Sequence, residues 1–254
     1  MIDRFAHPAR VRSRPATRAA ARAAEPTVRV YVWDLVVRLT HWTIALSIVG
    51  LALTGFYIGN PFLGTSGAAG DHFVMGWARI IHFYTSIAFG LAVFARIVWM
   101  FVGPPQASWR QLIPTTRQRW RDLFGTLAFY ALLRDRPPPA RGHNALAGAA
   151  YLVVFGLYLL LILTGVALYS ASAHVDSYMR WFGFLVDLFG GAQTARYLHH
   201  VTMWIVIIFV AQHVYSSLLT SRVEKNGTID SIFSGYKFLP PEEAEETKEE
   251  RTRE

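Results

Sequence analysis

The chain has 254 residues, of which 53% are hydrophobic and only 17% charged, and its formal net charge is +8. A soluble domain carries about 25% charged residues, so this composition excludes an ordinary soluble enzyme. The sequence contains no cysteine, which excludes disulfides, cysteine-ligated iron–sulfur clusters and covalently attached c-type haem within this chain.

Residues 1–27 are rich in Arg, Ala and Pro and predict a disordered cytoplasmic tail, and residues 239–254 predict a second, charged one. We expect residues 28–238 to form one membrane domain. A helix needs about 20 apolar residues to cross a bilayer. Four stretches meet this length, over about 35–58, 73–102, 145–170 and 195–220. We therefore predict an all-α membrane protein, a bundle of four transmembrane helices.

The positive charge is unevenly distributed along the chain. Arginines gather before and at the start of the first span (Arg4, Arg10, Arg12, Arg14, Arg18, Arg22, Arg29, Arg38) and between the second and third spans (Arg110, Arg117, Arg119, Arg121, Arg134, Arg136, Arg141). The loops 59–72 and 171–194 together contain one arginine, Arg180. Because basic residues concentrate in cytoplasmic loops, both termini and the middle loop are predicted to be cytoplasmic. This distribution favours a membrane over a nucleic-acid partner.

Two loop segments are amphipathic or aromatic. In the middle loop, Trp, Phe and Leu alternate with Arg over about 109–133, as in helices that lie in the membrane interface, so we expect contact with lipid. The external segment 171–194 carries Tyr178, Trp181, Phe182 and Phe184, which could form a surface helix where a partner protein docks. We expect no internal repeat.

Four histidines lie inside the predicted spans, where an ionisable ring is costly and needs a reason. His199 and His213 are separated by about 21 Å along one helix and share a face to within roughly 40°, at 1.5 Å and 100° per residue. His200 points about 140° away from His213 at the same angular step. The topology places His41 near the depth of His213, and His82 near the depth of His199.

Imidazole is an ordinary axial ligand of haem iron, and helix bundles build cofactor sites from facing helices. A single intramembrane histidine could equally be a hydrogen-bonded core residue or a proton relay. Four at two matched depths favour two bis-histidine b haems: an inner one on His41 and His213, and an outer one on His82 and His199.

Three arginines precede proposed ligands by three residues, which places them one turn closer to the membrane surface: Arg38, Arg79 and Arg196. Arginine suits carboxylates, so we expect these side chains to bind haem propionates. For Arg38, simple positive-inside flanking is an equal alternative. Arg96, 14 residues after His82, is expected to serve the inner haem or a buried ion pair.

His143 opens the third span on the predicted cytoplasmic side. It could donate a hydrogen bond to a quinone carbonyl or carry a proton. A role as an ordinary residue at the start of a helix is equally compatible with the sequence.

Several stretches together resemble one family, the b-type cytochrome subunit of membrane-bound nickel–iron uptake hydrogenases. The resembling stretches are Trp33-Asp34, Arg38-Leu39-Thr40-His41-Trp42, Thr54-Gly55-Phe56-Tyr57-Ile58-Gly59, Phe73-Val74-Met75-Gly76-Trp77-Ala78-Arg79-Ile80-Ile81-His82-Phe83, His199-His200, Trp204, His213-Val214-Tyr215 and Ser234-Gly235-Tyr236-Lys237. They are spread from residue 30 to about 238. The arginine-rich start of the chain departs from the family pattern.

The resemblance implies a multi-pass protein of the bacterial cytoplasmic (inner) membrane. Its partners would be a nickel–iron hydrogenase, with an iron–sulfur small subunit and a large subunit that activates hydrogen. Electrons would pass through two b haems to a membrane quinone. The family's four axial histidines match His41, His82, His199 and His213, and His143 matches a position on the quinone side.

Two other functions remain open from the sequence. The chain could be a stand-alone cytochrome b561-type carrier that passes electrons between a small reductant or superoxide and quinone, which would keep both haems. It could also be a non-redox transporter or anchor, which would be colourless.

Overall fold

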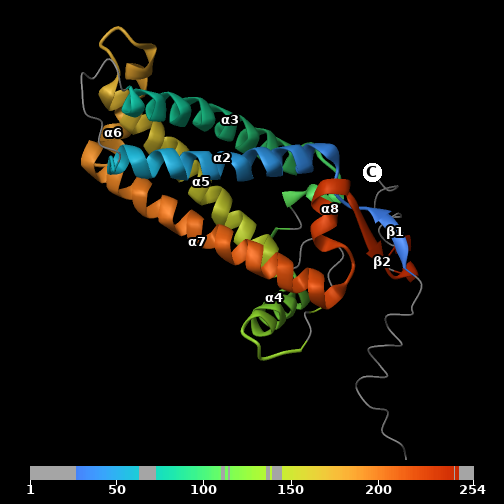
Figure 1. Ribbon diagram of the computed structural model, residues 1–254. Helices are drawn as coiled ribbons and strands as arrows, with labels where there is room; N and C mark the ends of the chain where they lie inside the picture. The colour runs from blue at the N-terminus through green and yellow to red at the C-terminus, as the bar shows by residue number, and fades with distance from the viewer. Residues whose placement is uncertain are drawn as a thin grey trace, which may run out of the picture.

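The computed structural model describes residues 27–62, 73–109, 112–113, 115–135, 138, 145–242 and 244–245. Its four long helices are α2 (Leu35–Gly59), α3 (Val74–Val102), α5 (Ala145–Ser172) and α7 (Ala192–Glu224). They run side by side as an elongated bundle (Figure 1). These helices confirm the four predicted ones. The largest difference is at α7, which begins three residues earlier and ends four residues later than expected.

The surface of this bundle is apolar along its length. The four helices have 25 to 33 residues each and are long and apolar enough to cross a membrane. Large side chains that are at least 64% exposed include Leu46, Leu53, Leu91, Phe94, Val153 and Ile208. Such a surface is costly in water and suited to lipid, where helices satisfy their own backbone groups. The protein is therefore a multi-pass membrane protein with four candidate spans.

The bundle consists of two antiparallel helix pairs. Helix α2 packs along α3, and α5 packs along α7. Aromatic contacts join one pair to the other: among them, Phe56 of α2 lies 5.2 Å from Trp204 of α7, and Phe83 of α3 stacks at 4.8 Å on Tyr169 of α5. Offset and edge contacts of this kind add to the stabilisation from buried area.

Asp34 fixes where α2 begins and ties it to the end of α3. One carboxylate oxygen accepts a hydrogen bond from the Val37 backbone N–H at 2.9 Å, which satisfies a helix donor that would otherwise lack a partner. The other accepts from Trp99 Nε1 at 2.9 Å. The predicted start at residue 35 follows from this N-cap.

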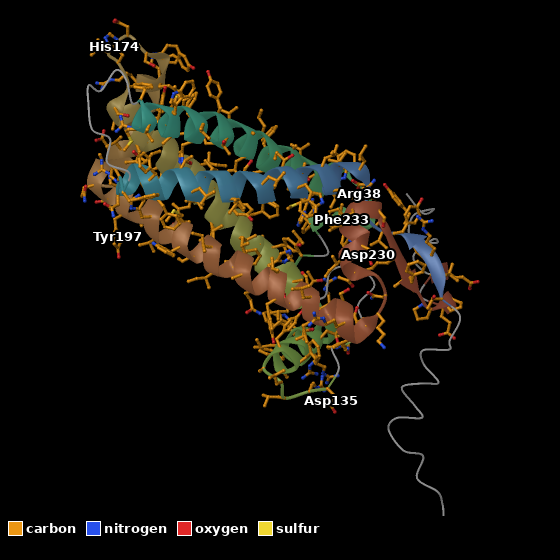
Figure 2. All side chains as sticks on the ribbon, in the orientation of Figure 1. Arg38, Asp135, His174, Tyr197, Asp230 and Phe233 are labelled. Carbon is orange, nitrogen blue, oxygen red and sulfur yellow. The ribbon has the colours of Figure 1, made fainter. Side chains whose placement is uncertain are left out.

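At the same end of the bundle, β1 (Val28–Tyr31) pairs antiparallel with β2 (Tyr236–Leu239), and α8 (Thr228–Ser234) precedes β2. Figure 2 shows Arg38, Asp230 and Phe233 at this end and His174 at the opposite one. Val30 and Val32 pack with Leu239 and Ala244 in a small buried cluster. This two-stranded sheet was not predicted; disorder of the remaining terminal segments stays a prediction.

The remaining short elements lie at the two ends. Helix η1 (Pro105–Ala107) follows α3, and α4 (Arg117–Tyr130) lies within the predicted amphipathic segment 109–133. Trp120, Phe124 and Leu127 form an exposed apolar stripe along α4, as an interfacial helix requires. At the opposite end, η3 (Tyr178–Gly183) and α6 (Phe184–Leu188) cover the turn between α5 and α7.

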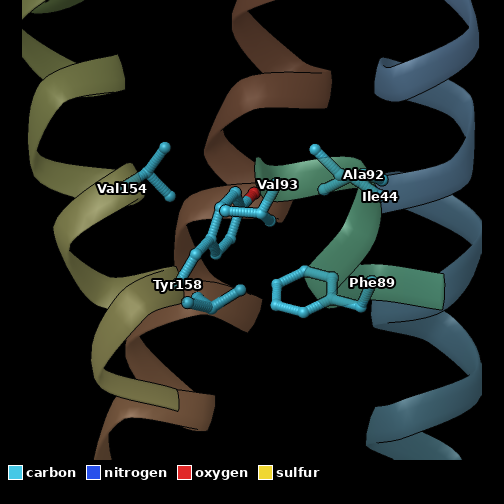
Figure 3. Packing of buried hydrophobic residues seen from close by; sticks show 7 residues of the cluster. Ile44, Phe89, Ala92, Val93, Val154 and Tyr158 are labelled. Carbon is cyan, nitrogen blue, oxygen red and sulfur yellow. The ribbon is translucent and has the colours of Figure 1, made fainter. Parts of the chain in front are cut away.

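The centre of the bundle is filled by apolar side chains from all four long helices (Figure 3). The buried cluster consists of Ile44, Phe89, Ala92, Val93, Val154, Tyr158 and Val206. Phe89 and Tyr158 meet edge to face with ring centres 5.2 Å apart. Val206 is seven residues from both His199 and His213, so this core separates the two histidine depths.

Candidate functional site

The structure brings His41 of α2 and His213 of α7 together near the end that carries β1 and α8. Their ring centres are 6.3 Å apart, with an angle of 53° between the ring planes. Two imidazoles on opposite sides of one metal ion have ring centres about 6 Å apart, given metal–nitrogen bonds of about 2 Å. Nδ1 of His41 is buried, and no described residue offers it a hydrogen bond. The separation fits two axial ligands of one iron.

His82 of α3 and His199 of α7 lie toward the other end, on the far side of the apolar core. They are close enough to interact electrostatically. Each ring is held by a threonine from the neighbouring helix of its pair. The Thr54 hydroxyl oxygen lies 2.8 Å from Nδ1 of His82, and the Thr164 hydroxyl oxygen lies 2.9 Å from Nδ1 of His199.

The threonine hydroxyls have defined roles in these bonds. Thr54 donates its proton to the Gly50 carbonyl at 2.7 Å, and Thr164 donates to the Leu160 carbonyl at 2.6 Å. With that proton engaged, each oxygen accepts from the ring, which places the ring proton on Nδ1. In a neutral imidazole the other nitrogen, Nε2, then carries the free lone pair that a metal needs.

A glycine follows each of these threonines and lies against the histidine ring. A Cβ on Gly55 would lie 3.5 Å from Cε1 of His82, and one on Gly165 would lie 3.4 Å from Cε1 of His199. Gly55 and Gly165 thus contact the two rings in the same way, each from the first helix of its pair.

Although we expected no internal repeat, one short motif recurs and has the same role in both helix pairs. The stretch Leu51-Ala52-Leu53-Thr54-Gly55 recurs in α5 as Leu161-Ile162-Leu163-Thr164-Gly165, and both copies hold a histidine of the second helix of their pair. Neither threonine was predicted as a site residue. The signal that could have found them was this repeated Leu-x-Leu-Thr-Gly motif.

His200 lies differently from its neighbour. Its side chain is exposed, and Cε1 lies 3.3 Å from where a Cβ on Gly59 would be. The His199 ring is the one that contacts Thr164. The structure is thus consistent with the choice of His199 over His200 from the angular spacing, although ligation itself stays a prediction.

The predicted arginines lie near the two ends of the bundle. Arg38 is half-buried and donates from Nη1 to the Phe233 carbonyl at 2.5 Å, whereas its Nε is buried and has no hydrogen-bond partner among the described residues. Arg79 and Arg196 are exposed, and Arg196 donates to Oε1 of Gln193 at 2.5 Å. Propionate binding by these three arginines stays a prediction.

Arg96 is buried, with 8% of its surface exposed. Its Nη1 donates to the Ala107 carbonyl at 3.3 Å, and Asp34 is near enough to interact with it electrostatically. Neither predicted role of Arg96, at the inner haem or in a buried ion pair, is decided by these contacts, and both stay predictions.

Comparison with known proteins decides the family. Residues 32–235 match the family described as prokaryotic cytochrome b561. The chain belongs to this family. It is 36% identical to the "Probable Ni/Fe-hydrogenase B-type cytochrome subunit" of Cupriavidus necator, over 82% of this chain and 86% of that protein. Proteins with the same function in their names match from Azotobacter vinelandii (34% identical, over 83% of this chain and 89% of that protein) and Escherichia coli K12 (31%, over 84% and 93%).

The family resemblance inferred from the sequence is thereby confirmed, and a b-type cytochrome carries haem b. The residues of this cytochrome fit that group. Two imidazole pairs lie at two depths of the bundle, one at the separation that a single iron would give, and the other with Nε2 left free on both rings. His143, predicted at the quinone side, lies outside the described residues.

Proposed function

We propose that this cytochrome is the membrane electron-transfer subunit of a nickel–iron hydrogenase and holds two b haems. His41 and His213 would bind the inner iron, and His82 and His199 the outer one. The observation that carries the proposal is the pairing of these four rings at two depths, on opposite sides of one apolar core.

Haem supplies a one-electron couple between ferrous and ferric iron. The chain's own residues determine where that couple can operate. His199 and His213 lie on one face of α7 about 21 Å apart along the helix, so α7 contributes a ligand at both depths. The distance between the two histidine depths is therefore a large part of the thickness of the hydrocarbon layer, which is about 30 Å.

The polar groups at each end would neutralise the haem carboxylates. Arg38 would serve the inner haem, Arg79 and Arg196 the outer one, and Arg96 the inner one if it leaves its present partners. Arg38 offers the best support, because its Nε is buried without a hydrogen-bond acceptor among the described residues. A propionate oxygen would satisfy that donor.

The orientation in the membrane follows from charge. The end formed by β1, β2, α8 and α4 carries arginine-rich segments, and the end formed by η3 and α6 carries Arg180 in its loop. By the positive-inside rule, the first end and both termini would be cytoplasmic, in a bacterial inner membrane. The inner haem would then lie near the cytoplasm.

The hydrogenase would dock at the opposite, outer end. The iron–sulfur small subunit would deliver electrons there, and the large subunit would activate hydrogen. The named function of the relatives in Cupriavidus necator and Azotobacter vinelandii supports this partner. Tyr178, Trp181 and Phe184 of η3 and α6 are each at least 61% exposed and would lie at that interface or in the lipid headgroups.

Quinone would accept the electrons at the cytoplasmic end, beside the inner haem. Two features support this placement: His143 comes two residues before α5 in the sequence, and α4 exposes an apolar stripe that suits the membrane interface. His143→Gln should slow quinone reduction while both haems stay reducible by hydrogen. Unchanged quinone reduction would contradict this placement.

The proposal is tested by purifying the complex through a tag on this chain. A reduced-minus-oxidised spectrum with b-haem bands, two haems per chain by pyridine haemochrome, and co-purification of a nickel–iron heterodimer are expected. Two haems without the heterodimer would indicate the stand-alone cytochrome b561-type carrier. A colourless chain would indicate the transporter or anchor.

A further inference from the structure

The two histidine pairs have different surroundings. At the outer pair, both rings donate from Nδ1 to a threonine hydroxyl, at 2.8 Å for His82 and 2.9 Å for His199. At the inner pair, Nδ1 of His41 is buried and has no hydrogen-bond partner among the described residues. The outer rings therefore have a hydrogen-bond partner at Nδ1, whereas the inner ring of His41 has none among the described residues.

The outer arrangement occurs twice and is built from the helix backbone. Thr54 donates to the carbonyls of Gly50 and Leu51, and Thr164 donates to the carbonyls of Leu160 and Leu161, the fourth and third residues before each threonine. Thr164 is fully buried. Chains of hydrogen bonds polarise one another, so the backbone carbonyl strengthens the hydroxyl oxygen as an acceptor.

We propose that Thr54 and Thr164 are positioning residues that fix the outer axial histidines and lower the reduction potential of the outer haem. The proposal rests on the proposed function, because it needs a haem at each depth. A hydrogen bond accepted from Nδ1–H orients the imidazole and makes Nε2 a stronger electron donor. A stronger donor stabilises ferric over ferrous iron, and second-shell hydrogen bonding is one of the levers that set haem potential.

A lower reduction potential at the outer haem favours electron flow in one direction. Transfer from the outer to the inner depth oxidises one iron and reduces the other, and no bond or proton changes place. Weakening the electron affinity of the outer site makes this step more favourable. The two threonines therefore favour flow from the outer end toward the end with α8 and β1.

The test is a redox titration of the purified complex, with each haem followed by its visible spectrum and its ferric EPR signal. Thr54→Val and Thr164→Val remove the hydroxyl with little change in shape. Each should raise the same one of the two midpoints and leave the other in place. The expected change is up to tenfold in the equilibrium constant for reduction, which is about 59 mV for one electron.

Matched variants separate the hydroxyl from the fold. Thr54→Ser and Thr164→Ser should restore the wild-type midpoint and EPR signal. Thr40 makes the same pair of backbone hydrogen bonds in α2, at 2.7 and 3.1 Å, and Thr40→Val should leave the outer midpoint unchanged. If a valine variant loses one haem, retention of that haem by its serine counterpart supports the same role.

Three results would overturn the inference in a chain that holds two haems: no shift in either midpoint, a shift to lower potential, or shifts of different haems by the two valine variants. A wild-type chain with fewer than two haems would instead contradict the proposed function. The two failures are thus distinguishable before any variant is made.

Discussion

Arg38 donates a hydrogen bond at 2.5 Å to the carbonyl of Phe233, 195 positions later in the chain. This bond joins the first turn of α2 to the last turn of α8. Next to it, the Trp42 ring lies 4.6 Å from the Phe233 ring, and Trp42 Nε1 donates to the Ile232 carbonyl at 3.3 Å. Because Trp42 also meets the His41 ring edge-on at 5.2 Å, α8 covers the inner histidine pair through Trp42.

The first prediction concerns this cover. Phe233→Ala should weaken retention of the inner haem and leave the outer haem in place, since aromatic pairs contribute about 0.5–1.5 kcal/mol beyond their buried area. The measurement is the haem content of the purified protein after dilution in detergent. The two redox midpoints show which of the two haems has been lost. Trp181→Ala, at the opposite end and 83% exposed, is the control and should retain both haems. Equal loss of the two haems from Phe233→Ala would contradict the prediction.

The second prediction assigns the ligands by pairs. His41→Ala and His213→Ala should each remove the inner haem and lower the content from two haems per chain to about one. His82→Ala and His199→Ala should each remove the outer haem, because an iron that loses one axial imidazole is held by one residue alone. Pyridine haemochrome gives the count, and the remaining midpoint identifies the haem. His200→Ala should retain both; loss of a haem there, with retention in His199→Ala, would reverse the assignment.

The sequence predicted the four helices and the two histidine depths because both depend on local regularities. Apolar length alone predicted α2, α3, α5 and α7, and the 14-residue spacing of His199 and His213 placed both on one face. The threonines were not predicted, because Thr54 and His82 meet only through the rotation of α2 against α3, which no spacing within one helix gives.

The sheet formed by β1 and β2 escaped prediction for a different reason. β1 and β2 have four residues each and pair Val28 with Leu239 across almost the whole chain. Strands this short show little periodic pattern in their sequence. Which strand pairs with β1 depends on how the helices between β1 and β2 pack, and not on the strand sequence alone. Trp33 shows the same dependence, since its Nε1 donates at 3.1 Å to the Ser231 hydroxyl.

The third prediction concerns Asp34. Asp34→Ala removes the N-cap of α2, which is worth about 1 kcal/mol, and leaves Trp99 Nε1 without its acceptor, at a cost of about 1–3 kcal/mol. Asp34→Asn keeps the cap and loses the Trp99 bond, so its stability should lie between wild type and Asp34→Ala. Thermal unfolding in detergent measures the order. If Asp34→Asn is as unstable as Asp34→Ala, the cap contributes nothing measurable.

The fourth prediction concerns Gly235, which ends α8 at φ +89°. Its carbonyl accepts from the N–H groups of Val32 and Trp33 at 2.8 and 3.1 Å. A Cβ at this position would lie 2.5 Å from Cε2 of Tyr31 and 2.8 Å from the Trp33 carbonyl oxygen. Gly235→Ala should therefore cost more than the about 1–2 kcal/mol of a left-handed backbone alone.

Thermal unfolding again measures the effect of Gly235→Ala, and limited proteolysis shows whether β1 and β2 separate. Gly183 is the matched control, because its φ is −57° and a Cβ there would meet nothing within 4 Å. Gly183→Ala should be neutral. Neutral behaviour of Gly235→Ala would mean that the sheet rearranges without cost.

The fifth prediction concerns Gly165, which lies against the His199 ring. A Cβ would lie 3.4 Å from Cε1 of that ring, a tight but ordinary contact, so Gly165→Ala should keep both haems. Alanine is favoured over glycine in a helix interior by about 1 kcal/mol, which offsets the cost of a small shift of the ring.

Gly165→Leu would push the His199 ring away from Thr164 and should remove the outer haem alone. Gly156 in the same helix has open space where a Cβ would be, so Gly156→Leu should retain both haems and controls for bulk in α5. If Gly165→Leu retains the outer haem at an unchanged midpoint, the contact of the His199 ring with Thr164 and Gly165 does not hold that ring in place.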